Sequence, residues 1–140
     1  MKKLIILSLF VLIFLISCSK TEVKQVTEDS KTATEAFLII NNMKDAYVKR
    51  DMKDIESCTT RDGYRTILGA IKNFDSVDIT FNPAFVEIDG DAVNVNVSWK
   101  GTWKKDGKII DERGIAIFVL KGRPLKVHNI LRANPFRYPE

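Results

Sequence analysis

The sequence predicts an α+β domain in which three N-terminal helices pack on a curved antiparallel sheet. Between residues 33 and 74, apolar side chains recur at spacings of three and four, the pattern of amphipathic helices. From Val77 onward the period changes to two, and turn sequences divide the rest of the chain into strands. We therefore expect the helices to be followed by an antiparallel meander.

The first 17 residues have the character of a secretory signal peptide. Met1-Lys2-Lys3 is basic, and the apolar run from Leu4 to Phe14 is shorter than the ~20 apolar residues of a membrane-spanning helix. The residues that follow, Leu15-Ile16-Ser17-Cys18, resemble the bacterial lipobox, whose cysteine becomes the lipidated first residue of the mature protein. The resemblance implies a cell-envelope lipoprotein, anchored in the membrane by diacyl or triacyl (palmitate-type) modification of Cys18. Ser19 in the next position favours the periplasmic side of the outer membrane if the organism is Gram-negative.

Composition limits the partners of the mature chain. The formal net charge is +4 and falls to +2 without Lys2 and Lys3, so we expect no nucleic-acid binding by a basic face. If Cys18 carries lipid, Cys58 has no disulfide partner, and we expect it to be a structural cysteine. His128 is the single histidine of the sequence. We therefore expect no metal site and no cofactor.

The predicted elements follow one another without a repeat. Residues 18–32 are polar and aperiodic, and we expect a disordered tether there. An amphipathic helix is predicted over 33–50. Asp51 is expected to cap a short second helix, and Asp62 a third. The folded domain is placed at 33–136.

Three turns set the register of the meander, at Gly90-Asp91, at Asp106-Gly107 and at residues 121–124. Counting back from these turns places nearly every large apolar residue on one face, and a slip of one residue would move that set to the other face. The predicted pairs are Ile88 with Val93, Trp103 with Ile110, Trp99 with Gly114, Phe118 with Val127, and Ala116 with Asn129. Because bulky residues oppose small ones, we expect a concave inner face.

Four parts of the predicted domain form a recognisable combination. They are Asp45-Ala46-Tyr47 with Arg50-Asp51, the hairpin 86–93, the strand segment Trp99-Lys100-Gly101-Thr102-Trp103, and Ile130 with Asn134-Pro135-Phe136. In this order they resemble the nuclear transport factor 2-like superfamily, which includes ketosteroid isomerases and SnoaL-type polyketide cyclases. The resemblance implies a cone with a pocket between helices and sheet, and dimers formed through the outer face of the sheet.

The inner face supplies the predicted ligand pocket. Its lining is Tyr47, Trp99, Trp103, Phe118 and Val127, with Glu112 and Asn129 as the polar exceptions. Tyr47 either directs its hydroxyl into the cavity or is a core tyrosine whose hydroxyl lies at the surface. Glu112 is either an acid or base made reactive by desolvation or a solvated residue at the rim. Asn129 either binds a ligand or satisfies a bend in the backbone. His128 falls on the outer face, opposite Ile117, out of reach of a ligand.

We therefore expect a membrane-anchored envelope lipoprotein with a non-catalytic domain that binds a small apolar ligand or an envelope protein. The alternative is an enzyme of the SnoaL or ketosteroid isomerase kind that uses the Glu112 carboxylate as acid or base. A third possibility is a scaffold whose cone is filled. A homodimer is expected through the outer face, whose apolar residues are Phe85, Ile115, Ile117, Val119 and Ile130.

Overall fold

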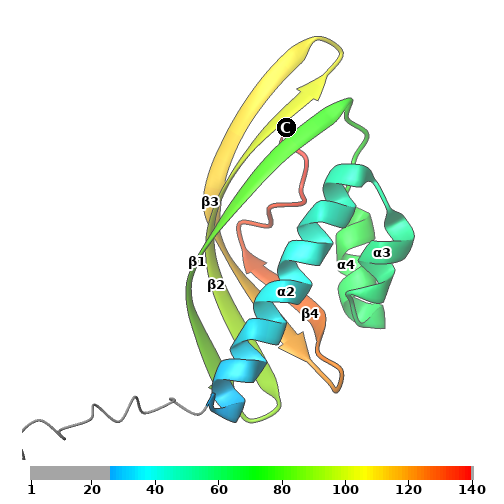
Figure 1. The fold of residues 1–140 in the computed structure, drawn as a ribbon. Coiled ribbons are helices and arrows are strands. Elements are labelled where there is room, and N and C mark those ends of the chain that lie inside the picture. Colours follow the sequence, from blue (N-terminus) through cyan, green and yellow to red (C-terminus); the bar gives the residue numbers. More distant parts are fainter. Residues whose placement is uncertain (1–25, 140) are drawn as a thin grey trace, which may run out of the picture.

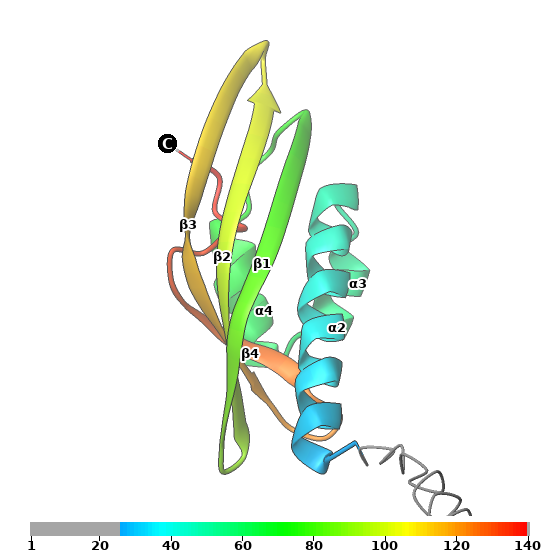
Figure 2. The ribbon, with the colours of Figure 1, turned by 60° about the vertical axis from the view of Figure 1, so that its left-hand side comes forward.

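Three helices and a four-stranded antiparallel sheet make up residues 26–139, the part of the chain that the structure, a computed structural model, describes. The elements are α2 (Glu28–Lys49), α3 (Met52–Ser57), α4 (Arg61–Ala70), β1 (Ser76–Asp89), β2 (Ala92–Lys105), β3 (Lys108–Lys121) and β4 (Lys126–Arg132). Figure 1 shows the long sheet curving around the helices, which lie on its concave side, and Figure 2 shows the same two layers from another direction. The predicted α+β class is confirmed, whereas the signal peptide and Cys18 lie outside the described residues.

Helix α2 begins earlier than the sequence predicts. Thr27 caps it by accepting a hydrogen bond from the Ser30 N–H (3.1 Å), and the acidic Glu28 and Asp29 complement the helix dipole in the first turn. The assignment of residues 28–32 to the tether is therefore wrong. These first turns project mostly into solvent, so they carry no apolar periodicity from which a helix could be predicted.

Both short helices begin with a side-chain cap. Asp51 accepts a hydrogen bond from the Asp54 N–H (3.0 Å), as predicted for α3. The cap of α4 is Thr60, whose hydroxyl accepts from the Gly63 N–H (3.2 Å). Asp62, the predicted cap, instead lies in the first turn of α4, where its charge favours the helix dipole.

The segment between α3 and α4 covers the edge of β4. Val127 donates its N–H to the Cys58 carbonyl and accepts from the Thr60 N–H, both at 2.9 Å, which forms a parallel bridge at Thr59. Gly63 is needed nearby because a Cβ there would lie 2.3 Å from the Val127 carbonyl oxygen. The helical layer is thus fixed to the sheet edge at Val127, whose outward backbone N–H and C=O groups are both paired.

The first two hairpins have the predicted register. The pairs are Ile88 with Val93, Trp103 with Ile110, and Trp99 with Gly114. Strand β1 continues through Asn82-Pro83, and its register shifts between Pro83 and Phe85. This bulge turns Phe85 to the outer face without ending the strand.

The third hairpin has a different register from the predicted one. The observed pairs are Phe118 with Ile130 and Ala116 with Arg132, in place of Val127 and Asn129 as partners. Because the offset is an odd number of residues, it exchanges the two faces of this part of β4. Ile130 is therefore buried in the core, and Asn129 pairs with Val119 on the outer side.

Two local features cause this offset. The turn after β3 contains four residues rather than two, and its Pro124 has no N–H to donate to the ladder. Strand β4 then carries one extra residue, His128, in a bulge. Neither feature alters the apolar alternation of the sequence, so counting back from the turn could not locate it.

The chain after β4 crosses the concave face and completes the core. The Ala133 N–H donates to the Ile115 carbonyl (3.1 Å), and the indole N–H of Trp99 donates to the Ala133 carbonyl (2.9 Å). These bonds direct the segment inward, where Phe136 is fully buried against Tyr47 of α2 on one side and Phe118 of β3 on the other. The C-terminal segment is therefore part of the hydrophobic core.

Candidate functional site

A buried hydrogen bond lies at the centre of the predicted pocket. The indole N–H of Trp103 donates to the hydroxyl of Tyr47 at 3.1 Å, and both side chains are almost fully buried. Burial raises the pKa of the Tyr47 phenol, and the hydrogen bond from Trp103 acts in the opposite direction. Tyr47 therefore stays neutral at physiological pH, and its oxygen already accepts a hydrogen bond from within the core.

Phe136 occupies the space that the cone encloses. Its ring centroid lies 5.0 Å from that of Tyr47, 6.1 Å from that of Phe118 and 6.2 Å from that of Phe81. The Asn134 side chain accepts a hydrogen bond from the Phe136 N–H (2.9 Å), which holds the backbone in the turn that presents the ring inward. The C-terminal segment of the chain thus fills the interior of the cone with the Phe136 side chain.

The predicted pocket residues come together as a packed cluster. Trp103, Phe118 and Val127 are 0% exposed, so no water-sized space adjoins their side chains. Trp99 packs edge-on against Trp103, with ring centroids 6.2 Å apart, and is covered by the segment at Ala133. The predicted lining is therefore closely packed around Trp103, Phe118 and Val127, whereas Tyr47 and Trp99 also border pockets at the surface of the domain.

The two polar candidates lie away from this interior. Glu112 pairs with Gly101 as predicted, and its side chain is exposed at the rim. The predicted position of Asn129 opposite Ala116 is wrong, because the offset of the third hairpin places it opposite Val119. The Asn129 side chain accepts a hydrogen bond from the Ile130 N–H (2.9 Å), so it satisfies the local backbone.

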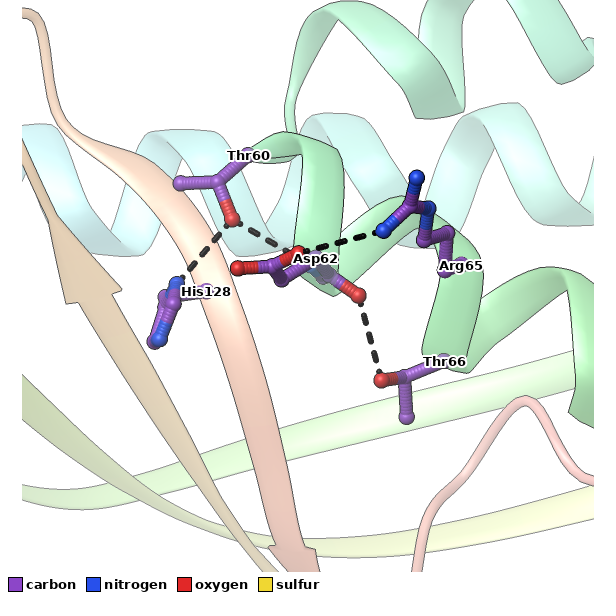
Figure 3. Close-up of polar contacts among 6 residues, drawn as sticks. Thr60, Asp62, Arg65, Thr66 and His128 are labelled. Atoms are coloured by element: carbon purple, nitrogen blue, oxygen red, sulfur yellow. Dashed lines mark hydrogen bonds and ion pairs between the residues drawn. The ribbon is translucent and has the colours of Figure 1, made fainter.

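His128 links the sheet to the helices, as Figure 3 shows. Its predicted place opposite Ile117 is wrong, since the bulge in β4 brings its Nδ1 within 3.1 Å of the Thr60 hydroxyl. That hydroxyl also accepts from the Gly63 N–H, so one side chain connects His128 of β4 to the first turn of α4. Next to it, Asp62 forms an ion pair with Arg65 at 3.8 Å. The contact between His128 and Thr60 therefore holds β4 against the start of α4.

Open space lies at the surface of the domain. A small pocket of about 180 Å³ lies at the C-terminal end of α2, where the Arg50 guanidinium stacks 4.8 Å from the centroid of the Phe74 ring. A groove of about 680 Å³ lies on the outer face of the sheet, where the Thr102 hydroxyl donates to the Asp111 carboxylate (2.5 Å). Charged and polar side chains contribute to the walls of both.

Cys58 is half-buried, and burial raises the pKa of its thiol, so it is poorly suited to act as a nucleophile. Within residues 26–139, no group of three or more histidine, cysteine, aspartate or glutamate side chains is arranged to hold a metal ion. In the same part of the chain, no helix combines the length and the apolar character needed to cross a membrane.

Helices packed across a curved antiparallel sheet give the domain the α+β cone fold of nuclear transport factor 2-like proteins. A solved structure with this fold is the nuclear transport factor 2 (NTF2-like) superfamily protein from Salmonella enterica subsp. enterica serovar Typhimurium str. LT2. It is 17% identical to this chain, with a TM-score of 0.57, over 71% of this chain and 89% of that protein. At this identity the likeness shows the fold alone. No model of a known protein family and no curated protein sequence matches the chain.

Sequence reasoning missed the part that the C-terminal segment plays. Asn134-Pro135-Phe136 contributes to the resemblance to nuclear transport factor 2-like proteins, but nothing in its apolar pattern indicates that Phe136 fills the cone. It also missed Thr60 as the partner of His128, because the two residues are 68 positions apart. Only the bulge in β4 brings them together.

Proposed function

We propose that this chain is a membrane-anchored lipoprotein of the cell envelope whose domain is a non-catalytic binding module for a protein partner. The observation that carries the proposal is the filled cone, in which Phe136 occupies the place where a small apolar ligand would bind. With the interior occupied, recognition is left to the surface of the domain. A thermal-shift screen of small apolar ligands is expected to show no stabilisation, and a ligand that raises the melting temperature by filling the cone would contradict the proposal.

The position of α2 supports anchoring through Cys18. The residues between Cys18 and the cap at Thr27 span at most roughly 35 Å when extended. The start of α2 lies at the same end of the domain as the β1–β2 and β3–β4 turns (Figure 1), so this end would face the lipid surface. Changing Cys18→Ala is expected to move the protein from the detergent phase to the aqueous phase, whereas Cys58→Ala serves as the control. Detergent-phase partitioning of Cys18→Ala would contradict anchoring at this residue.

We propose a second copy of the chain as the partner of the outer sheet face. Phe85, Ile115 and Leu131 are 56%, 52% and 43% exposed there, and Ile117 and Val119 are half-buried between them. Leu131 takes the place predicted for Ile130, which belongs to the core. An exposed apolar patch of this kind favours an interface, and a two-fold dimer would set the patch against itself.

Light scattering on the full chain in detergent tests this dimer. We expect a dimer for the wild type, a monomer for Ile115→Asp, and a dimer for Ile109→Asp, whose side chain is also exposed but lies near the start of β3, away from the patch. A wild-type monomer at tens of micromolar would contradict the proposed partner.

The enzyme hypothesis has weaker support. Ketosteroid isomerases hold a general-base carboxylate deep in the cone, whereas Glu112 is exposed at the rim. The polar residue Thr59 is also buried, and its hydroxyl donates a hydrogen bond to the Ile55 carbonyl (3.0 Å), so it satisfies the local backbone. We expect no isomerisation of an unsaturated ketosteroid. Turnover that disappears in Glu112→Gln would favour the enzyme instead.

A further inference from the structure

A positively charged groove lies where the chain leaves β4, outside the cone. It has a volume of about 490 Å³. Its lining comes from β2, β3, the end of β4 and the C-terminal segment, and comprises Trp99, Glu112, Arg113, Arg132, Asn134 and Arg137 together with Ala133, Tyr138 and Pro139. Three arginines from three parts of the chain thus border one groove.

The groove exists because the chain turns sharply at the end of β4. Arg132 has a left-handed backbone (φ 65°), which is uncommon for a residue with a side chain. Gly114 permits the turn, since a Cβ there would lie 2.6 Å from the Ala133 Cβ. The segment therefore lies close against β3, and Arg132 and Arg113 line the same groove.

Arg137 is held at the groove by the residues around it. Its N–H donates to the Asn134 carbonyl (3.2 Å), and the flanking Phe136 is fully buried. The exposed Arg137 side chain therefore extends from an anchored backbone. At the same place, the Lys105 ammonium lies 5.3 Å from the centroid of the Tyr138 ring and adds a further positive charge.

The charges of the groove are unbalanced. Glu112 is the one acidic side chain in the lining, against three guanidinium groups that stay charged at any physiological pH. Within residues 26–139, the ion pairs are Glu28–Lys31, Lys44–Asp45 and Asp62–Arg65, and none involves these arginines. Several guanidinium groups that share one groove and lack carboxylate partners attract an anion.

We propose that this groove binds the oxyanion group, carboxylate or phosphate, of a small acidic ligand. The planar guanidinium fork matches both groups through paired hydrogen bonds, and Tyr138 adds an aromatic side chain to the groove lining. In Figure 1 the C-terminal segment, which lines the groove, ends far from the start of α2 and hence far from the proposed anchor. The ligand is therefore a soluble acid rather than a headgroup of the anchoring membrane.

Calorimetric titration of the full chain in neutral detergent, at constant ionic strength, tests the groove with inorganic phosphate and with succinate. We expect one equivalent of at least one probe to bind, and the probe that binds tells phosphate from carboxylate recognition. Arg113→Gln and Arg137→Gln should each lower the affinity by about tenfold, as the loss of a charge-assisted hydrogen bond predicts. Glu112→Gln should raise it.

Arg65→Gln is the matched control, because this exposed arginine pairs with Asp62 on α4, outside the groove lining. It should bind the probe as the wild type does. The proposal is overturned if neither probe binds, if both groove variants bind as tightly as the wild type, or if Arg65→Gln weakens binding equally. Circular dichroism confirms that each variant is folded. The anion site requires neither the lipid anchor nor the second copy, so its failure would leave both proposals standing.

Discussion

At the scale of single residues, the bond between Trp103 and Tyr47 holds the helical layer to the sheet. Removing the hydroxyl leaves the buried Trp103 N–H without its acceptor. Tyr47→Phe is therefore expected to lower the free energy of unfolding by about 1–3 kcal/mol, measured by urea denaturation. Tyr64→Phe, at a half-buried tyrosine of α4, is the control and should change it by less than about 0.5 kcal/mol. Equal effects of the two substitutions would contradict this role.

Because of the same tyrosine, the free energy of unfolding depends on pH in the alkaline range. Burial raises the Tyr47 pKa above its ordinary value of 10.0, so the native chain keeps a proton that the unfolded chain releases. The contribution is complete below pH 10 and is lost as the pH rises above it. The stability advantage of wild type over Tyr47→Phe should therefore shrink as the pH rises above about 10. An advantage that stays constant as the pH rises would show that the phenol titrates as in the unfolded chain.

At the scale of elements, two glycines of α4 allow the effect of packing on stability to be measured apart from the effect of helix propensity. At Gly63 a Cβ would lie 2.3 Å from a backbone oxygen of β4, whereas at Gly69 nothing lies within 4 Å. We expect Gly63→Ala to lower the free energy of unfolding by about 1–3 kcal/mol through overpacking. Gly69→Ala should raise it by up to about 1 kcal/mol, because alanine is the better helix former. Stabilisation by Gly63→Ala would contradict the close approach of α4 to β4.

The C-terminal segment is the second element whose role can be measured. Phe136 is fully buried, so Phe136→Ala should lower the free energy of unfolding by about 3–5 kcal/mol. Phe85→Ala, at a phenylalanine that is 56% exposed on the outer face, should change it by less than about 0.5 kcal/mol in the monomer. If Phe136→Ala were as mild as Phe85→Ala, the segment would not be a structural part of the domain.

At the scale of the whole molecule, the sequence predicts the class of fold and most of the sheet. The alternation of Trp99 and Trp103 with polar residues, together with tight turns containing glycine, determines two hairpin registers correctly. The register predicted for the third hairpin is wrong. The longer turn and the bulge at His128 shift the pairing but leave the apolar alternation unchanged, so the sequence pattern does not reveal them. The predicted start of α2 is wrong for a related reason, since the first turns of the helix are solvated and carry no periodic apolar face.

The candidate site could be predicted only in part. Tyr47, Trp103 and Phe118 do come together, because strand register and helix periodicity determine which face each occupies. Whether the space between them is open or filled depends on Phe136, whose position is set by an irregular turn after β4. Tertiary contacts of this kind leave no periodic pattern in the sequence. The arginine groove depends on the same turn and was missed for the same reason.

The central claim is that the chain's own aromatic side chains fill the cone. The indole N–H of Trp103 reports on it directly, because this proton points to the Tyr47 hydroxyl in the middle of the cluster. We propose to follow its NMR resonance while benzene is added to the wild type and to Phe136→Ala. The account predicts no shift in the wild type and a saturable shift in the variant, whose cavity admits the ring. A saturable shift in the wild type would contradict it.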